Sequence, residues 1–230
     1  MRAIRTINPR KIAVLTIALT AILIASCERE NIIYTEIPDK LSNDYLPLMT
    51  GNVWNYSNSR ATVKEVVTIN NKEYYEVVNE SIVADTVFYT YKEYYRKTSD
   101  GKVFMITSDK KREILKYDFA APVKSSWTYP EDDNNHLWKV SKISNNLKVV
   151  VNNRQISNCM KFDYDLIQAV DDEHTIILAP GIGRLISQSY AWGVADTLRS
   201  AIINGVEYRI KYFLNTKDLF PVNKPGTTCH

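Results

Sequence analysis

Three histidines are the residues best suited to acid–base or metal chemistry in this 230-residue chain, and none has a catalytic context. His136 follows the polar run 131–135, His174 follows the acidic run 171–173, and His230 is the last residue. None belongs to a His-Glu-x-x-His motif or lies beside a Gly-x-Ser-x-Gly elbow. Neither acidic run has the glycine and distal glutamate of a calcium loop, so solvated loops explain both runs more simply. We therefore expect no catalytic residue, no metal site, no cofactor and no enzyme activity.

The first 27 residues carry the clearest chemical signal. Four basic residues precede Ile12–Ser26, which has no charge. A 15-residue helix rises about 22 Å, short of the roughly 30 Å hydrocarbon core, which favours a cleaved signal peptide over a membrane span. The segment Ile24-Ala25-Ser26-Cys27 resembles the bacterial lipobox, in which the cysteine sulfur receives a diacylglycerol before cleavage. The resemblance implies lipidation at Cys27; the alternative is an ordinary secretory signal.

A lipid at Cys27 would place the protein in the cell envelope. Each buried CH₂ contributes about 0.8 kcal/mol, so two or three acyl chains hold a protein stably on a membrane. Residues 28–31, Glu-Arg-Glu-Asn, resemble the surface-export signals of Bacteroidetes lipoproteins, although a plain polar tether explains them as well. We expect attachment to the outer membrane, on its periplasmic or its surface face. Without residues 1–26 the chain has 25 basic and 26 acidic residues, which gives no electrostatic case for nucleic acid as a partner.

Short alternating runs broken by turn dipeptides make up the rest of the chain. They predict a mostly β protein with a single curved antiparallel sheet or half-barrel, meander connections and few short helices. One helical turn is expected within Asp39–Leu48. The predicted organisation is a signal peptide over 1–26, a lipidated tether over 27–44 and one antiparallel β domain over 45–230. Five predicted hairpin turns separate the runs: Asn70-Asn71, Asp100-Gly101, Asn145-Asn146, Asn152-Asn153 and Asn204-Gly205.

Two motifs resemble those of an uncharacterised group of bacterial envelope lipoproteins. Pro47-Leu48-x-x-Gly51-Asn52-x-Trp54 resembles the motif that opens their domain, and Ala179-Pro180-Gly181-Ile182-Gly183 resembles their closing turn. A weaker copy of the opening motif, 121–127, has Ser126 where that group usually has glycine. The resemblance implies a sheet similar to the half-barrel of periplasmic lipoprotein carriers, with Gly51, Gly181 and Gly183 as structural turns.

Aromatic side chains are the remaining candidates for binding. Tyr89 and Tyr91 alternate on one face of the strand predicted over Thr86–Lys97, while Trp54 and Trp127 lie in two other predicted strands. Their apolar bodies and polar tips suit a partly wet groove, although core packing is the simpler explanation. We therefore expect a lipid-anchored envelope module that holds a hydrophobic ligand, a lipid or a segment of an envelope protein. The alternatives are a structural or assembly lipoprotein without a small-molecule ligand and, third, an undetected hydrolase or metal enzyme.

Two cysteines remain after Cys27. Cys159 and Cys229 would close a loop of about 70 residues if they paired, as the oxidising envelope permits. The alternative is a buried Cys159 and a free Cys229. The residues themselves leave both arrangements open.

Overall fold

The structure, a computed structural model, describes residues 37, 41–107, 109–130, 136–167, 169, 172–190, 193–211 and 213–214. All of them belong to one compact unit, Thr35–His230. The predicted signal peptide and most of the predicted tether lie outside these residues, so the domain boundaries stay predictions. Nowhere in the described residues is there a helix long and apolar enough to cross a membrane.

Every regular element among the described residues is a strand. The strands are β1 (Val53–Tyr56), β2 (Ser59–Ile69), β3 (Lys72–Val83), β4 (Thr86–Lys97), β5 (Lys102–Ile106), β6 (Glu113–Asp118), β7 (Ser126–Pro130), β8 (Leu137–Val151), β9 (Arg154–Leu166), β10 (His174–Ala179), β11 (Gly183–Ser189), β12 (Ala195–Ile203), β13 (Val206–Arg209) and β14 (Phe213–Leu214). The density of Val, Ile, Tyr and Thr explains the preference for strands. Residues 41–48, where the sequence allows a helical turn, contain bends and no helix.

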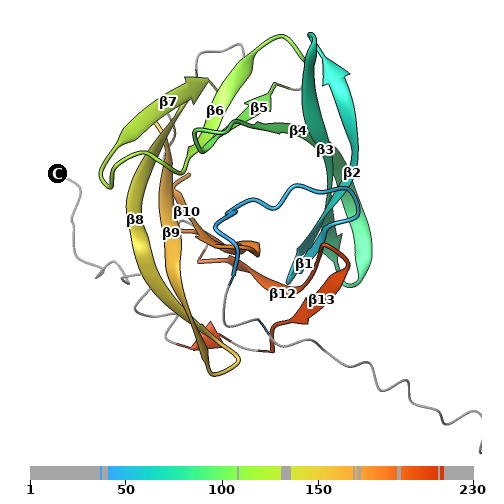
Figure 1. Cartoon of the computed structure of the whole chain (residues 1–230), viewed down its shortest axis with the longest axis vertical. Helices are drawn as coiled ribbons and strands as arrows, with labels where there is room; N and C mark the ends of the chain where they lie inside the picture. The colour runs from blue at the N-terminus through green and yellow to red at the C-terminus, as the bar shows by residue number, and fades with distance from the viewer. Residues whose placement is uncertain are drawn as a thin grey trace, which may run out of the picture. The chain divides into compact units, whose positions relative to one another are not determined.

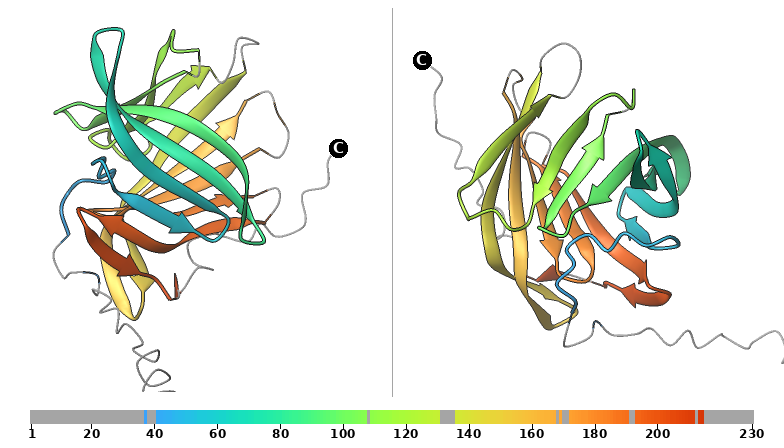
Figure 2. Two further views of the ribbon diagram at one scale, coloured as in Figure 1. Left: turned by 90° about the vertical axis from the view of Figure 1, so that its right-hand side faces the viewer. Right: turned by 45° about the horizontal axis from the view of Figure 1, so that its top comes forward.

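The strands form one antiparallel sheet that curls into a nearly closed, barrel-like ring (Figures 1 and 2). The order is β14-β8-β9-β10-β11-β12-β1-β2-β3-β4-β5-β6, with β13 beside β12 and β7 beside β8. Most neighbours are consecutive in the chain, and the pairing of β1 with β12 joins its two halves. The prediction of a mostly β protein with one curved antiparallel sheet is confirmed.

Four of the five predicted hairpin turns are confirmed. Both residues of Asn70-Asn71, Asn152-Asn153 and Asn204-Gly205 have positive φ, as a two-residue turn between twisted strands requires, and Gly101 has φ of +86°. The prediction for Asn145-Asn146 was wrong, because both residues lie inside the long strand β8. There β9 offers a continuous partner strand, so the extra residues are taken up as bulges in the β8–β9 ladder.

One hairpin turn had no recognisable sequence signal. Ala84 and Asp85 connect β3 to β4 with φ of +48° and +62°. Alanine rarely adopts this backbone conformation, so no residue pattern in the sequence predicts the turn. The observed β3 therefore extends to Val83, and β4 begins at Thr86.

The ring has a seam where β6 and β7 meet without a backbone ladder. Trp127 of β7 donates from Nε1 to the carbonyl oxygen of Leu115 in β6, at 2.9 Å. Lys116 of β6 donates from Nζ to the hydroxyl of Tyr129 in β7, at 3.1 Å. Side chains therefore supply, across this seam, the links that backbone amides supply elsewhere in the ring.

A buried lysine adds a third link beside the seam. Lys142 of β8 is 1% exposed, and its Nζ donates to the carbonyl oxygens of Phe119 and Ala121, at 2.7 and 2.8 Å. Burial lowers the pKa of Lys142. These two bonds fix the chain just after β6 against β8, so the residues that lead from β6 to β7 are held from both sides.

Residues 41–52 cross one end of the ring before β1 begins (Figure 1). The carbonyl of Asp44 accepts a hydrogen bond from the amide of Gly181, and its carboxylate pairs with Lys97, at 2.8 and 2.6 Å. Tyr45 donates to the carbonyl of Asn158 at 2.7 Å, and Leu48 is buried in the main core. This segment therefore covers the end of the ring near the β4–β5 and β10–β11 turns.

Candidate functional site

A small cavity with both polar and apolar lining lies in the interior of the ring. Its volume is about 70 Å³. Arg184, Glu93 and Asn79 supply its charged and amide groups. The other lining residues are Leu46, Leu48, Trp54, Tyr56, Ala61, Val77, Tyr95, Tyr117 and Leu178. A cavity of this size holds about two water molecules and no acyl chain.

Arg184 is the central charge of this interior. Its guanidinium lies 3.9 Å from the centre of the Tyr56 ring, and its Nη2 is 3.4 Å from the Asp196 carboxylate. Burial works against the charged form, but Tyr56 and Asp196 outweigh it, and the pKa of Arg184 is raised. The buried Nε has no hydrogen-bond partner among the described residues. Arg184 is thus a permanent cation stacked on an aromatic ring.

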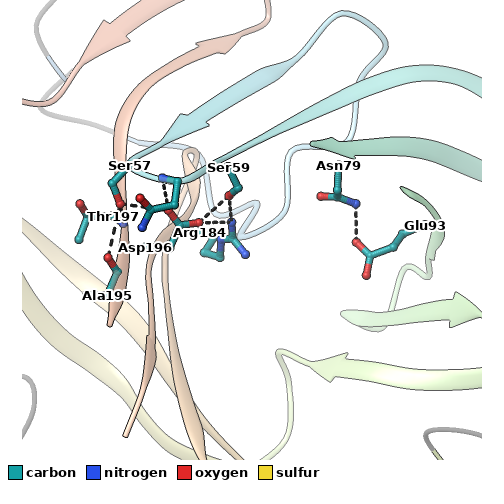
Figure 3. A network of polar contacts seen from close by, with 9 residues as sticks. Ser57, Ser59, Asn79, Glu93, Arg184, Ala195, Asp196 and Thr197 are labelled. Atoms are coloured by element: carbon teal, nitrogen blue, oxygen red, sulfur yellow. Dashed lines mark hydrogen bonds and ion pairs between the residues drawn. The ribbon is translucent and has the colours of Figure 1, made fainter. Parts of the chain in front are cut away.

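Asp196 is held in place by the turn between β1 and β2 (Figure 3). Its Oδ1 accepts from the amide of Asn58 and the hydroxyl of Ser57, at 2.8 and 3.1 Å. Its Oδ2 accepts from the hydroxyl of Ser59 at 2.5 Å. These donors hold the Asp196 carboxylate beside Arg184, so Asp196 positions the guanidinium.

A second carboxylate lines the same cavity from β4. Glu93 accepts from the amide nitrogen of Asn79 on β3 at 2.8 Å, and Figure 3 shows this pair across from Arg184. Burial and the nearby Glu93 raise the pKa of the Tyr95 hydroxyl well above its ordinary value. The cavity therefore has one cation and one carboxylate on facing strands, each with its own partner.

His174 is enclosed by aromatic rings. It stacks on Tyr164 with ring centres 4.6 Å apart and meets Trp138 edge to face at 5.1 Å. Burial, with the positive charge of Lys116, lowers the pKa of His174 to about 4. No group of three or more His, Cys, Asp or Glu residues within the described part of the chain could hold a metal ion. Residues 131–135 and 171, which belong to the acidic runs, lie outside that part.

The β3–β4 hairpin carries the largest exposed aromatic surface of the described residues. Phe88 is 82% exposed, Tyr89 58% and Tyr91 43%. The rings of Tyr89 and Tyr91 stack with centres 5.8 Å apart. Val83 and Val87 of the same hairpin are also exposed. An apolar surface of this kind on a folded domain marks an interaction site.

The four aromatic residues proposed from sequence separate into two kinds. Tyr89 and Tyr91 lie together on the exposed hairpin. Trp54 is 4% exposed and its Nε1 donates to the carbonyl of Ile182, while Trp127 is half-buried and spans the seam. No ring contact among the described residues joins either tryptophan to the tyrosine pair. The ligand-binding role of these four residues stays a prediction.

Two residues of the surfaces described above, Phe88 and Arg184, were not identified as candidates from the sequence. Phe88 is the most exposed of the large apolar residues, but it follows a turn that the sequence does not mark. Arg184 follows a glycine turn, and its role depends on β12 and the β1–β2 turn, which are distant in sequence. Only the density of aromatic residues in Thr86–Lys97 pointed to this hairpin.

The cysteine predictions are tested only in part. Cys159 is completely buried, and burial raises the pKa of its thiol to about 12. Cys27 and Cys229 lie outside the described residues. Lipidation at Cys27 and a Cys159–Cys229 disulfide therefore stay predictions.

Comparison with known proteins assigns no family to this chain. No family model and no curated protein matches it. A matching solved structure is that of a protein from Parabacteroides distasonis described as a lipoprotein. The two are 12% identical, the match covers 75% of this chain and 100% of the other, and the TM-score is 0.38. The proposals below rest on the site itself.

Proposed function

We propose that this protein is a lipid-anchored module of the cell envelope that docks a partner segment on the β3–β4 hairpin. The anchor is the lipid on Cys27, in the outer membrane. The observation that carries the docking role is the exposure of Phe88, Tyr89 and Tyr91 on one hairpin. Aromatic side chains contribute large contact areas at protein interfaces and are enriched there.

The dimensions of the cavities favour a partner segment over a lipid ligand. Small-molecule sites measure roughly 300–1,000 Å³, and the interior cavity measures about 70 Å³. A wider depression of about 580 Å³ lies between Asn43–Tyr45 and the β4–β5 turn. It is open to solvent, and Asp44, Lys97 and Asp100 line it beside apolar groups. The interior cavity is too small and this depression too open to enclose an acyl chain, so the proposal places binding on the hairpin.

A structural or assembly lipoprotein without a ligand is the second candidate. The packed interior supports it, because the indole nitrogens of Trp54 and Trp127 are both engaged in bonds that hold the ring together. In that case the hairpin aromatics would have no partner that binds them.

In-cell photo-crosslinking distinguishes the two candidates. A photoreactive phenylalanine analogue replaces Phe88 in the full chain, and a control places it at Val66, which is 46% exposed on β2. We expect a defined higher-mass adduct from position 88 and none from position 66. Adducts of equal yield at both positions, or none at position 88, would remove the docking proposal.

The anchor is tested separately. Cys27→Ala should abolish incorporation of labelled palmitate and leave an unprocessed or mislocalised chain. Incorporation at the wild-type level in this variant would refute the lipid assignment. Because this experiment does not involve the hairpin, its result does not affect the interpretation of the crosslinking experiment.

A further inference from the structure

Two opposite charges line the interior cavity without pairing with each other. Arg184 of β11 and Glu93 of β4 both belong to its lining and lie across from each other (Figure 3). The ion pair of Arg184 is with Asp196, and no ion pair joins Glu93 to a cation among the described residues. The cavity therefore has a charged hydrogen-bond donor on one side and a charged acceptor on the other.

The guanidinium of Arg184 keeps donors available for a ligand. Its Nη2 reaches the oxygens of Asp196 and Ser59 only at 3.4 Å, which is long for a charged hydrogen bond. Its Nε is buried and has no hydrogen-bond partner among the described residues. A guanidinium presents its N–H groups in a planar fork that matches the two oxygens of a carboxylate. A carboxylate in the cavity would therefore meet donors that the protein itself leaves weakly bonded.

The carboxylate of Glu93 lacks a positive partner. It accepts a hydrogen bond from the side-chain amide of Asn79 at 2.8 Å, but that amide carries no charge. Lys116 directs its ammonium to the hydroxyl of Tyr129 at 3.1 Å and forms no ion pair with Glu93. A half-buried carboxylate is costly unless a positive group compensates it. An ammonium group in the cavity would supply the charge that Glu93 lacks.

The other walls limit the ligand to a very small molecule. Leu48, Trp54 and Leu178 belong to the main core and line the cavity with apolar atoms. The side chain of Arg184 is 30% exposed, so solvent reaches the charged end of the cavity. The volume of about 70 Å³ is roughly that of two water molecules, which is close to the space that glycine occupies. A side chain as large as that of leucine does not fit.

We infer that this cavity binds a small zwitterionic α-amino acid of the size of glycine, with its carboxylate on Arg184 and its ammonium on Glu93. One carbon atom separates the two charged groups of such a molecule, so both fit in a cavity of this volume. A simple carboxylic acid would meet Arg184 but leave Glu93 without a cation, and a simple amine would do the reverse. The zwitterion is neutral overall, so it adds no net charge to the interior. The site is separate from the exposed hairpin, so the inference goes beyond the proposed function.

Equilibrium dialysis of the full chain, purified in detergent, against radiolabelled glycine tests the inference. We expect saturable binding that excess unlabelled glycine abolishes. Acetate, methylammonium and leucine at the same excess should leave the label bound, because each lacks one charge or exceeds the cavity. Arg184→Gln and Glu93→Gln should each weaken binding about tenfold or more, since each removes one charged hydrogen-bonding partner of the ligand. The competition uses the wild-type chain, so it does not depend on whether a variant folds.

Glu80→Gln is the matched control. Glu80 pairs with Arg60 and does not line the cavity, so the same change of carboxylate to amide should leave glycine binding at the wild-type level. The inference is overturned if glycine shows no saturable binding, or if acetate or methylammonium displaces it as well as unlabelled glycine does. It is also overturned if folded Glu93→Gln binds glycine as tightly as Glu80→Gln does. None of these results affects the crosslinking experiment at position 88.

Discussion

The indole nitrogen of Trp54 donates a 2.6 Å hydrogen bond to the carbonyl oxygen of Ile182, which lies 128 residues later in the chain. The two motifs recognised in the sequence are therefore two halves of one contact. Asn52 completes it, since its side chain donates to Pro47 O at 2.6 Å and accepts from the amide of Asn204 at 2.8 Å. The motifs join the start of β1 to the β10–β11 turn and the β12–β13 turn.

Gly183 is the position where this contact tolerates no side chain. Its φ is +98°, and an added Cβ would lie 3.1 Å from Trp54 Nε1. Gly183→Ala should lower the free energy of unfolding by about 2–4 kcal/mol, since strain and crowding add. Denaturant titration measures the loss. Gly193→Ala is the control, because it has positive φ and open space around it; an equal loss at both positions would contradict the role of Trp54.

The second prediction concerns the hydrogen bond that Trp127 makes across the seam between β6 and β7. Trp127→Phe keeps the aromatic ring but leaves the carbonyl of Leu115 without its donor, which should cost about 1–3 kcal/mol of unfolding free energy. Tyr45→Phe also removes a donor to a backbone carbonyl, but at an exposed site where water replaces it. We expect a smaller loss there. Equal losses of unfolding free energy in the two variants would mean that the bond from Trp127 to Leu115 stabilises the fold no more than an exposed bond does.

His174 predicts a stability change in mild acid. Its pKa is about 4 in the folded chain and 6.5 ordinarily, so the unfolded chain binds the proton more tightly. Stability is fully present above pH 6.5 and falls as the pH decreases toward 4. The change is at most about 3 kcal/mol, and less because the ring is partly exposed. His174→Phe keeps the stacking on Tyr164 and should remove this dependence; an unchanged pH profile would exclude His174 as its source.

Glu113 predicts a second change at lower pH. Burial alone would raise its pKa, but hydrogen bonds from Arg96, Lys72 and Tyr74 outweigh burial and hold the pKa at about 2, against an ordinary 4.5. The stability it contributes is present above pH 4.5 and is lost as the pH falls through 2. Glu113→Gln should be less stable than wild type at pH 7, by at most about 3 kcal/mol, and the two should converge near pH 2. If Glu113→Gln differed from wild type by the same unfolding free energy at every pH, the hydrogen bonds to Glu113 would not be the cause of the pH dependence.

Sequence patterns located most strands, but they could not show which aromatic side chains the fold would bury and which it would leave exposed. Alternation and β-branched residues placed the strand over Thr86–Lys97 at its observed bounds. Local turn chemistry failed where tertiary pairing decided the outcome, as at Asn145-Asn146. Trp54 was a reasonable candidate for a groove, but no local signal reveals that a carbonyl 128 residues away accepts its N–H. The meeting of Arg184 and Glu93 at one cavity likewise depends on the curl of the sheet, which turns β11 and β4 toward each other.

The β6–β7 seam gives the ring a built-in hinge line. Separating any two laddered strands breaks a row of backbone hydrogen bonds, whereas parting β6 from β7 breaks the bonds of Trp127 and Lys116 and leaves each ladder whole. Local opening follows the line of fewest cooperative bonds. We therefore expect the ring to open first between β6 and β7, and water to reach the aromatic core along this line.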